Sequence, residues 1–140
     1  MTEARPFTHR DSGTDEPTWL LDAEWDTVPR LDLAAITARC PHILVVAPHP
    51  DDETLSLGAT LADLSASGAD VTVVFLTHGG DGPAATPRRI EGDRAIAVLG
   101  GQIATLWWDL PDGGLETSHD DLRRRLAGLI DEHTVVFAPV

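Results

Sequence analysis

Four short apolar runs, separated by amphipathic segments, are the feature that most limits how this chain can fold. The runs cover residues 43–47, 71–76, 103–107 and 134–138 and contain many β-branched side chains. Such runs are typical of strands that are buried on both faces, as in a parallel sheet. The sequence therefore predicts four strands in one buried sheet.

The segments between the runs have the patterns of helices. The spacing of leucines in the first segment predicts a helix that ends near Gly68. Thr86 followed by Pro87 predicts the start of a second helix, and Ser118 with Asp121 predicts the start of a third. The apolar faces expected for the three helices are Leu57, Leu61 and Leu64; Ala95, Ile96 and Leu99; and Leu122, Leu126, Leu129 and Ile130.

Strands that alternate with helices predict β-α-β units with right-handed crossovers. We therefore expect an α/β fold, a three-layer Rossmann-like parallel sheet with helices on both faces. The fourth run lies at the very end of the sequence, so we expect this domain, residues 41–140, to be truncated after its fourth strand and incomplete at its C-terminus. Residues 1–40 are polar and interrupted by prolines, which predicts a partly ordered N-terminal arm.

Composition narrows the range of partners. Asp and Glu total 23 against 10 basic residues, which gives a formal net charge of −13, and every basic residue is an arginine. A polyanion would be repelled by this surface, so we expect no nucleic-acid partner, and the absence of lysine excludes chemistry that depends on a lysine amine. Cys40 has no second cysteine to pair with, and no apolar run is long enough to span a bilayer, so we expect a cytoplasmic protein without membrane insertion. The sequence is compatible with a homo-oligomer.

The unusual polar residues of the sequence follow the predicted strands. The first three runs lead into the segments 48–53 (Pro-His-Pro-Asp-Asp-Glu), 77–82 (Thr-His-Gly-Gly-Asp-Gly) and 108–114 (Trp-Asp-Leu-Pro-Asp-Gly-Gly). In open parallel sheets, ligands bind at the carboxyl ends of the strands, where such loops converge. We therefore expect a functional site at this edge of the sheet.

The first of these segments carries the most specific chemistry. His49 and Asp52 offer an imidazole and a carboxylate, which are ligands that zinc accepts together, and Asp51 would then be a free carboxylate placed as a general base. The alternative is helix capping, because acidic residues favour the first turn of any helix. Capping does not require a histidine between two prolines.

These residues also carry a family resemblance. The segment 47–53, Ala-Pro-His-Pro-Asp-Asp-Glu, resembles the signature of the PIG-L / LmbE-like zinc de-N-acetylases, which remove acetyl groups from N-acetylglucosamine-type substrates. The segment 111–113, Pro-Asp-Gly, is similar to the short motif after the family's third strand, and the resemblance covers the chain from about residue 42 onward. The positions that match the pattern of the family's second helix are Arg88, Glu91, Ala95, Leu99 and Gly100.

The resemblance implies roles for the first segment. His49 and Asp52 would be zinc ligands and Asp51 would be the general base of an amide hydrolysis, with Zn²⁺ or another divalent metal as cofactor. The metal would polarise the acetyl oxygen and lower the pKa of its water, whose proton Asp51 accepts. Glu53 would cap the following helix or support the ligands.

The resemblance further implies a small-molecule partner, an acetylated amino sugar. Arg88 would bind a carbonyl, phosphate or acetate oxygen of this substrate, and Asp112 would bind sugar hydroxyls. The family's third zinc ligand and its acid-donating histidine lie after the fourth strand, which places them beyond Val140. His78, a loop histidine beside glycines, is expected to contact solvent or substrate rather than to replace that ligand. Because two protein ligands hold zinc more weakly than three, we expect little deacetylase activity from the 140-residue chain alone.

Two alternatives come from other functional classes. A receiver-type signalling domain is also a small α/β sheet with an acidic pair after strand one and an aspartate after strand three, here Asp109 or Asp112. Receiver domains also use a lysine near the last strand, which this chain lacks. The second alternative is a catalytically silent binding module that keeps the fold without a complete metal site.

Overall fold

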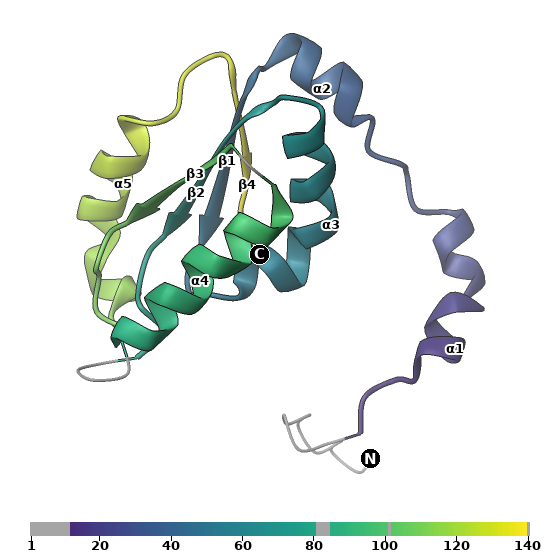
Figure 1. The fold of residues 1–140 in the computed structure, drawn as a ribbon, viewed down its shortest axis with the longest axis horizontal. Coiled ribbons are helices and arrows are strands. Elements are labelled where there is room, and N and C mark those ends of the chain that lie inside the picture. Colours follow the sequence, from purple (N-terminus) through teal and green to yellow (C-terminus); the bar gives the residue numbers. More distant parts are fainter. Residues whose placement is uncertain (1–11, 81–84, 101, 140) are drawn as a thin grey trace, which may run out of the picture. The chain divides into compact units, whose positions relative to one another are not determined.

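The computed structural model describes residues 12–80, 85–100 and 102–139 (Figure 1). The chain divides into two compact units, Met1–Leu31 and Asp32–Val140. Among the described residues, no helix is both long and apolar enough to cross a membrane.

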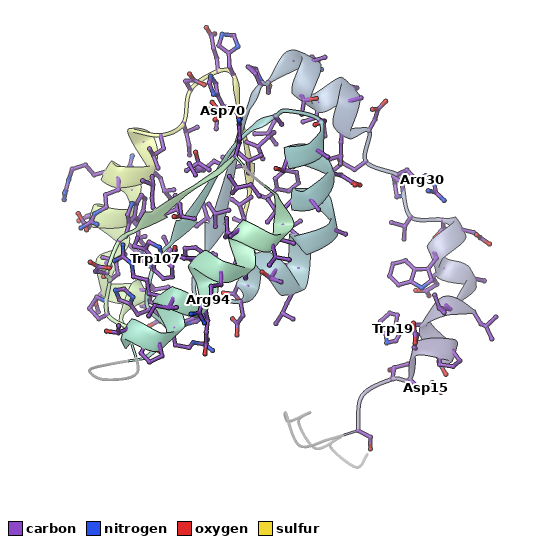
Figure 2. The ribbon with its side chains drawn as sticks, viewed as in Figure 1. Asp15, Trp19, Arg30, Asp70, Arg94 and Trp107 are labelled. Carbon is purple, nitrogen blue, oxygen red and sulfur yellow. The ribbon has the colours of Figure 1, made fainter. Side chains whose placement is uncertain are left out.

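The first unit contains two short helical segments, α1 (Glu16–Leu20) and the 3-10 helix η1 (Ala23–Asp26). Its main internal contact joins two tryptophans: the indole N–H of Trp25 donates to the carbonyl oxygen of Trp19 at 2.6 Å, and the two rings lie 5.8 Å apart. Figure 2 labels Trp19 on α1. Neither helical segment has a buried residue, so the two have no core of their own.

The second unit is built on a four-stranded sheet. Its strands are β1 (His42–Ala47), β2 (Asp70–Phe75), β3 (Ile103–Trp107) and β4 (Thr134–Phe137). They lie in the order β3-β2-β1-β4, and every pairing is parallel. The predicted parallel α/β sheet is therefore confirmed.

Helices cover both faces of this sheet, as predicted. On one face lie α2 (Leu33–Arg39), α3 (Asp52–Ala66) and α4 (Ala85–Leu99); on the other lie the 3-10 helix η3 (Leu115–Ser118) and α5 (His119–Ala127) (Figure 1). Right-handed crossovers explain the division, because β1, β2 and β3 follow one another in one direction while the chain returns across the sheet to reach β4. The returning crossover carries its helix on the opposite face.

The core follows the alternation of side chains along β1. Ile43, Val45 and Ala47 pack with residues of α3 and α4, whereas Leu44 and Val46 pack with residues of η3 and α5. All five are buried, which accounts for the unbroken apolar run in the sequence. Edge strand β4 is only half-buried.

Helix α2 falls within the predicted 1–40 arm but belongs to the sheet unit. Leu33 and Ile36 pack against the core beneath α3, and the side chain of Asp32 accepts a hydrogen bond from the Ala35 amide at 2.9 Å. This N-cap explains why the compact unit begins at Asp32.

The helix ends agree with the sequence patterns only in part. Gly68 follows α3 with a φ of +78°, the left-handed conformation expected of a glycine that ends a helix. Helix α4 begins at Ala85, so Pro87 lies in its first turn. Backbone amides in the first turn have no acceptor within the helix, so a proline there costs no hydrogen bond.

The third helix starts where predicted, with Ser118 at the N-cap of α5, but the predicted capping hydrogen bonds are absent. The Ser118 hydroxyl donates to the carbonyl oxygen of Gly114, and Asp121 forms ion pairs with Arg124 and Arg125 instead of capping. Helix α5 ends at Ala127, so the predicted apolar positions Leu129 and Ile130 lie beyond it, and both are partly exposed.

Two helical glycines provide a test of the packing between α4 and β3. A Cβ atom on Gly92 would lie 3.1 Å from the Trp107 ring, which itself stacks on Phe75 at 4.1 Å, whereas a Cβ atom on Gly58 would meet Thr54 and Leu99 no closer than 3.7 Å. We expect Gly92→Ala to lower the free energy of unfolding by about 1 kcal/mol or more, because the enclosed tryptophan has little room to move.

The matched variant Gly58→Ala is expected to raise the free energy of unfolding by up to about 1 kcal/mol, since alanine is the better helix former. Chemical denaturation of both variants makes the comparison. Equal shifts in the same direction would contradict the close packing of α4 on Trp107.

Candidate active site at the carboxyl edge of the sheet

The loops that leave β1, β2 and β3 are held together by backbone hydrogen bonds beyond the strand ends. The amide of Leu76 donates to Ala47 at 2.9 Å, the amide of Thr77 to Pro48 at 3.1 Å, and the amide of Leu110 to Leu76 at 2.9 Å. The order of the strands reverses between β1 and β4, so the first loop lies at the switch point of the sheet, the usual ligand site of such folds. The predicted polar segments 48–53 and 108–114 and residues 77–80 of the second segment therefore meet at one edge, while residues 81 and 82 lie outside the described part of the chain.

Three of the predicted site residues form one cluster. The Nε2 atom of His49 lies 2.9 Å from an oxygen of Asp112, and its Nδ1 atom lies 3.5 Å from Oδ2 of Asp52. The same Asp52 oxygen accepts a hydrogen bond from the His49 amide at 2.9 Å. Asp112 therefore contacts His49 in this structure, a contact that sequence reasoning did not anticipate.

One pair of donor atoms in this cluster has the separation expected of two ligands of a metal ion. Two ligands on a tetrahedral zinc ion, each about 2.0–2.2 Å from the metal, lie roughly 3.3–3.6 Å apart, and the Nδ1 atom of His49 and Oδ2 of Asp52 have that separation. Zinc-bound histidines usually donate their second N–H to a carboxylate, the position that Asp112 occupies. Within residues 12–80, 85–100 and 102–139, no three His, Cys, Asp or Glu side chains are grouped to hold a metal ion.

Asp51 lies in a different environment from Asp52. One of its carboxylate oxygens is 3.3 Å from the guanidinium of Arg88, which also donates to the Pro50 carbonyl oxygen at 2.9 Å. Asp51 and Arg88 line a pocket between α3 and α4, while Asp52 lines a second pocket beside Phe137 of β4. The structure thus brings the predicted general base together with Arg88, and the predicted ligands together with Asp112.

Backbone strain marks the turn at Asp51. Its φ of +124° is a conformation that residues other than glycine rarely adopt. The amide of Asp51 donates at 3.0 Å to Glu53, whose side chain is only 1% exposed and whose other oxygen accepts from the Thr54 hydroxyl at 2.7 Å. Strained backbone of this kind persists where the surrounding structure holds it, and it is common at active sites.

These contacts bear on the capping alternative. The side chain of Asp51, at the N-cap position of α3, makes no cap hydrogen bond. The Glu53 carboxylate accepts the hydrogen bond of the N-cap amide, that of Asp51, and in this way stabilises the turn. Capping therefore accounts for Glu53 but leaves the carboxylate of Asp51 available for chemistry.

A second histidine–carboxylate pair lies beside this site. Nε2 of His78, after β2, is 2.6 Å from an oxygen of Asp109, after β3. From the sequence alone, His78 is expected to be a loop residue, and Asp109 enters only in the receiver-domain alternative. Their positions after neighbouring strands are the signal that points to the contact.

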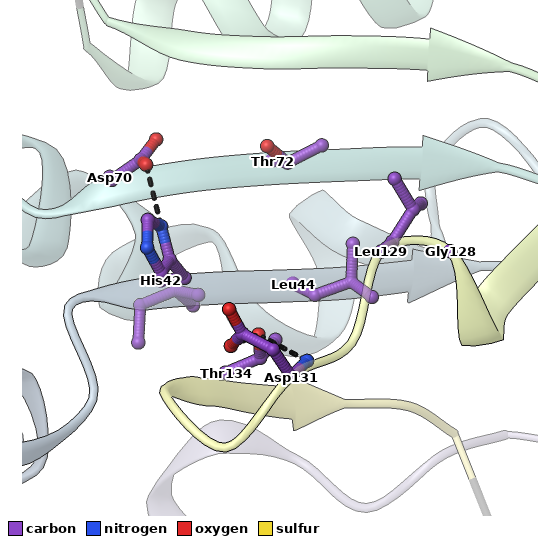
Figure 3. A pocket seen from close by; sticks show the side chains of 9 residues that line it. His42, Leu44, Asp70, Thr72, Gly128, Leu129, Asp131 and Thr134 are labelled. Atoms are coloured by element: carbon purple, nitrogen blue, oxygen red, sulfur yellow. Dashed lines mark hydrogen bonds and ion pairs between the residues drawn. The ribbon is translucent and has the colours of Figure 1, made fainter.

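The pocket shown in Figure 3 lies at the opposite, amino edge of the sheet. There His42 contacts Asp70 at 2.8 Å, and Asp131 accepts hydrogen bonds from the Thr134 hydroxyl and the His133 amide. Both hydrogen bonds lower the pKa of Asp131, and the bond from Thr134 has the larger effect. These contacts join the strand starts and include none of the predicted site residues.

Comparison with known proteins identifies relatives of the sheet unit. The family model PIG-L, described as GlcNAc-PI de-N-acetylase, matches residues 44–140. The 1D-myo-inositol 2-acetamido-2-deoxy-alpha-D-glucopyranoside deacetylase of Mycobacterium avium is 45% identical over 71 residues, which are 49% of this chain and 24% of that protein. The enzyme of the same name from Mycolicibacterium gilvum is 34% identical over 118 residues, 70% of this chain and 42% of that protein.

Two solved structures are similar as well. The conserved protein TT1542 from Thermus thermophilus has a TM-score of 0.57 and 37% identity over 70% of this chain and 46% of its own. The N,N'-diacetylchitobiose deacetylase of Pyrococcus horikoshii has a TM-score of 0.56 and 26% identity over 84% and 46%. The chain spans less than half the length of each of these relatives. On the match of its residues 44–140, the chain belongs to the PIG-L family.

Proposed function

We propose that this protein contributes to a zinc-dependent hydrolase that removes the acetyl group from an N-acetylglucosamine-type or related acetylated amine. Membership in the PIG-L family and the names of its deacetylase relatives support this function. The observation that carries the proposal is the 3.5 Å separation of Nδ1 of His49 from Oδ2 of Asp52, which suits two ligands of one metal ion, at the switch point of the sheet. Asp112 contacts the other ring nitrogen of His49. Another divalent metal could take the place of zinc.

In this proposal, His49 and Asp52 would hold the metal. When bound, zinc supplies a Lewis acid that polarises the acetyl carbonyl and lowers the pKa of water. The contact between Asp112 and Nε2 of His49 would leave Nδ1 as the ligand atom and would hold the ring in one orientation. Asp112 also has a second carboxylate oxygen with which to accept a hydrogen bond from a sugar hydroxyl.

Asp51 would accept the proton of the attacking water. A general base must reach that proton directly, and the positive φ of Asp51 places its carboxylate on the α4 side of the turn, beside the pocket that it shares with Arg88. Arg88 holds one oxygen of Asp51 and keeps further N–H donors for a substrate oxygen. The two residues together would orient the acetyl group and the water.

The two alternatives fare differently. Membership in the PIG-L family replaces the receiver-domain interpretation. Of its two candidate aspartates, Asp109 contacts His78 and Asp112 contacts His49. A catalytically silent binding module would have the same fold, so metal binding is the property that distinguishes it from the enzyme. Loss of a single proposed ligand therefore distinguishes them.

Zinc affinity is the first test of the proposed site. We expect Asp52→Ala to weaken zinc binding more than about tenfold, because one of the two protein ligands is lost. Competition with a chromophoric chelator measures the affinity. Asp63→Ala, which removes an exposed carboxylate from the same helix, is the matched control and should bind zinc as the wild type does. Equal affinity in wild type and Asp52→Ala would favour the silent module.

The strain at Asp51 gives a second test, which needs no activity. Asp51→Gly and Asp51→Ala both remove the carboxylate, but only glycine adopts a φ of +124° without a steric cost. We expect Asp51→Gly to be more stable than Asp51→Ala by about 1–2 kcal/mol in chemical denaturation. Elsewhere in a helix or its first turn the order would be reversed, so a more stable alanine variant would contradict the strained turn.

A further inference from the structure

The pair formed by His78 and Asp109 joins two loops that flank the proposed site. Its atoms Nε2 and Oδ1 are 2.6 Å apart, and the side chains are 20% and 62% exposed. Among the described residues, neither side chain contacts the proposed metal ligands. The pair therefore requires an explanation other than metal binding.

His78 is held on a rigid base. Its ring stacks on Trp107 with centroids 5.4 Å apart and planes within 10° of parallel. Trp107, labelled in Figure 2, stacks in turn on Phe75 at 4.1 Å and donates its indole N–H to Asp93 at 3.1 Å. Stacking fixes the plane of the imidazole, and the contact with Asp109 fixes which way its Nε2 atom points.

Asp109 controls the path of the loop that carries Asp112. Its φ of +53° is left-handed, a conformation that aspartate tolerates better than most residues. The amide of the next residue, Leu110, donates a hydrogen bond at 2.9 Å to the carbonyl oxygen of Leu76, the residue that follows β2. Three residues after this bend, Asp112 reaches His49.

The residue after His78 supports the other half of the site. A Cβ atom on Gly79 would lie 3.0 Å from a terminal nitrogen of Arg88 and 3.1 Å from Pro50. The backbone at Gly79 therefore lies directly against the guanidinium that binds Asp51 and against the turn that precedes it. A shift of His78 would carry Gly79 with it and displace Arg88.

We propose that His78 and Asp109 are positioning residues for the deacetylase site. Their contact holds the loops after β2 and β3 to each other. This one interaction therefore positions both Gly79, which lies against Arg88, and the loop that carries Asp112 to His49. This inference rests on the proposed function, because Arg88 and Asp112 are its substrate-binding residues. Neither member of the pair touches the reacting atoms.

Amide hydrogen exchange, followed by NMR, tests whether the pair couples the two loops. Asp109→Gly keeps the left-handed backbone and removes the contact, and we expect exchange at Gly79, in the other loop, to quicken about tenfold. His78→Ala should quicken exchange at Leu110 by a similar factor. Asp109→Asn, which keeps an oxygen acceptor, and His119→Ala, which removes an exposed histidine on α5, should exchange as the wild type does.

Binding of N-acetylglucosamine to the zinc-loaded protein, measured by NMR titration, separates positioning from simple stability. We expect Asp109→Gly to weaken this binding about tenfold while zinc affinity and the thermal midpoint stay close to wild type. Asp109→Asn should restore the binding.

Two results would overturn the proposal. Exchange at Gly79 that is unchanged in Asp109→Gly would show that the pair does not couple the loops. Exchange that quickens while sugar affinity stays at the wild-type value would show that the pair serves stability alone. A wild-type protein that binds zinc but no N-acetylglucosamine would contradict the proposed function, and the exchange results would still decide whether the pair locks the loops.

Discussion

Parallel pairing of β1 with β2 on one side and β4 on the other is the interaction on which the sheet unit depends. Every residue of β1 after His42 is buried, so its two faces hold the helices of both outer layers. The strand ends at Ala47, where the ladder to β2 continues through Pro48. The first residues free of the ladder are His49 to Glu53, and this turn is therefore anchored to the buried central strand of the sheet.

Much of this arrangement follows from local sequence patterns. Burial on both faces makes strands 43–47 and 71–76 recognisable, and the polar loops after them had to share an edge once the strands were parallel. The hydrogen bonds at the helix starts were less predictable than their positions, because Asp121 has two arginines nearby and pairs with them instead of capping α5. Local propensity does not determine whether an acidic side chain such as Asp121 binds a backbone amide at the helix start or a neighbouring arginine.

Within the site, residue types were predictable and contacts were not. The sequence pattern and the family resemblance point to His49, Asp51 and Asp52, but the meeting of His49 with Asp112 depends on how the loop after β3 bends at Asp109. The strain at Asp51 and the buried support from Glu53 likewise arise from tertiary packing. Two histidine–carboxylate pairs result. In one, Asp112 contacts Nε2 of His49, and in the other, Asp109 contacts His78, whose ring stacks on Trp107.

The most direct test of the central claim is the imidazole ¹⁵N spectrum of the protein during a zinc titration, because it identifies the histidine and the nitrogen atom that bind the metal. Of the 6 histidines in the chain, only His49 is expected to respond at its ligand atom. Its Nδ1 resonance should move on zinc binding, while Nε2 keeps its proton and its hydrogen bond to Asp112. A zinc-dependent change at His78, or at Nε2 rather than Nδ1 of His49, would contradict the account.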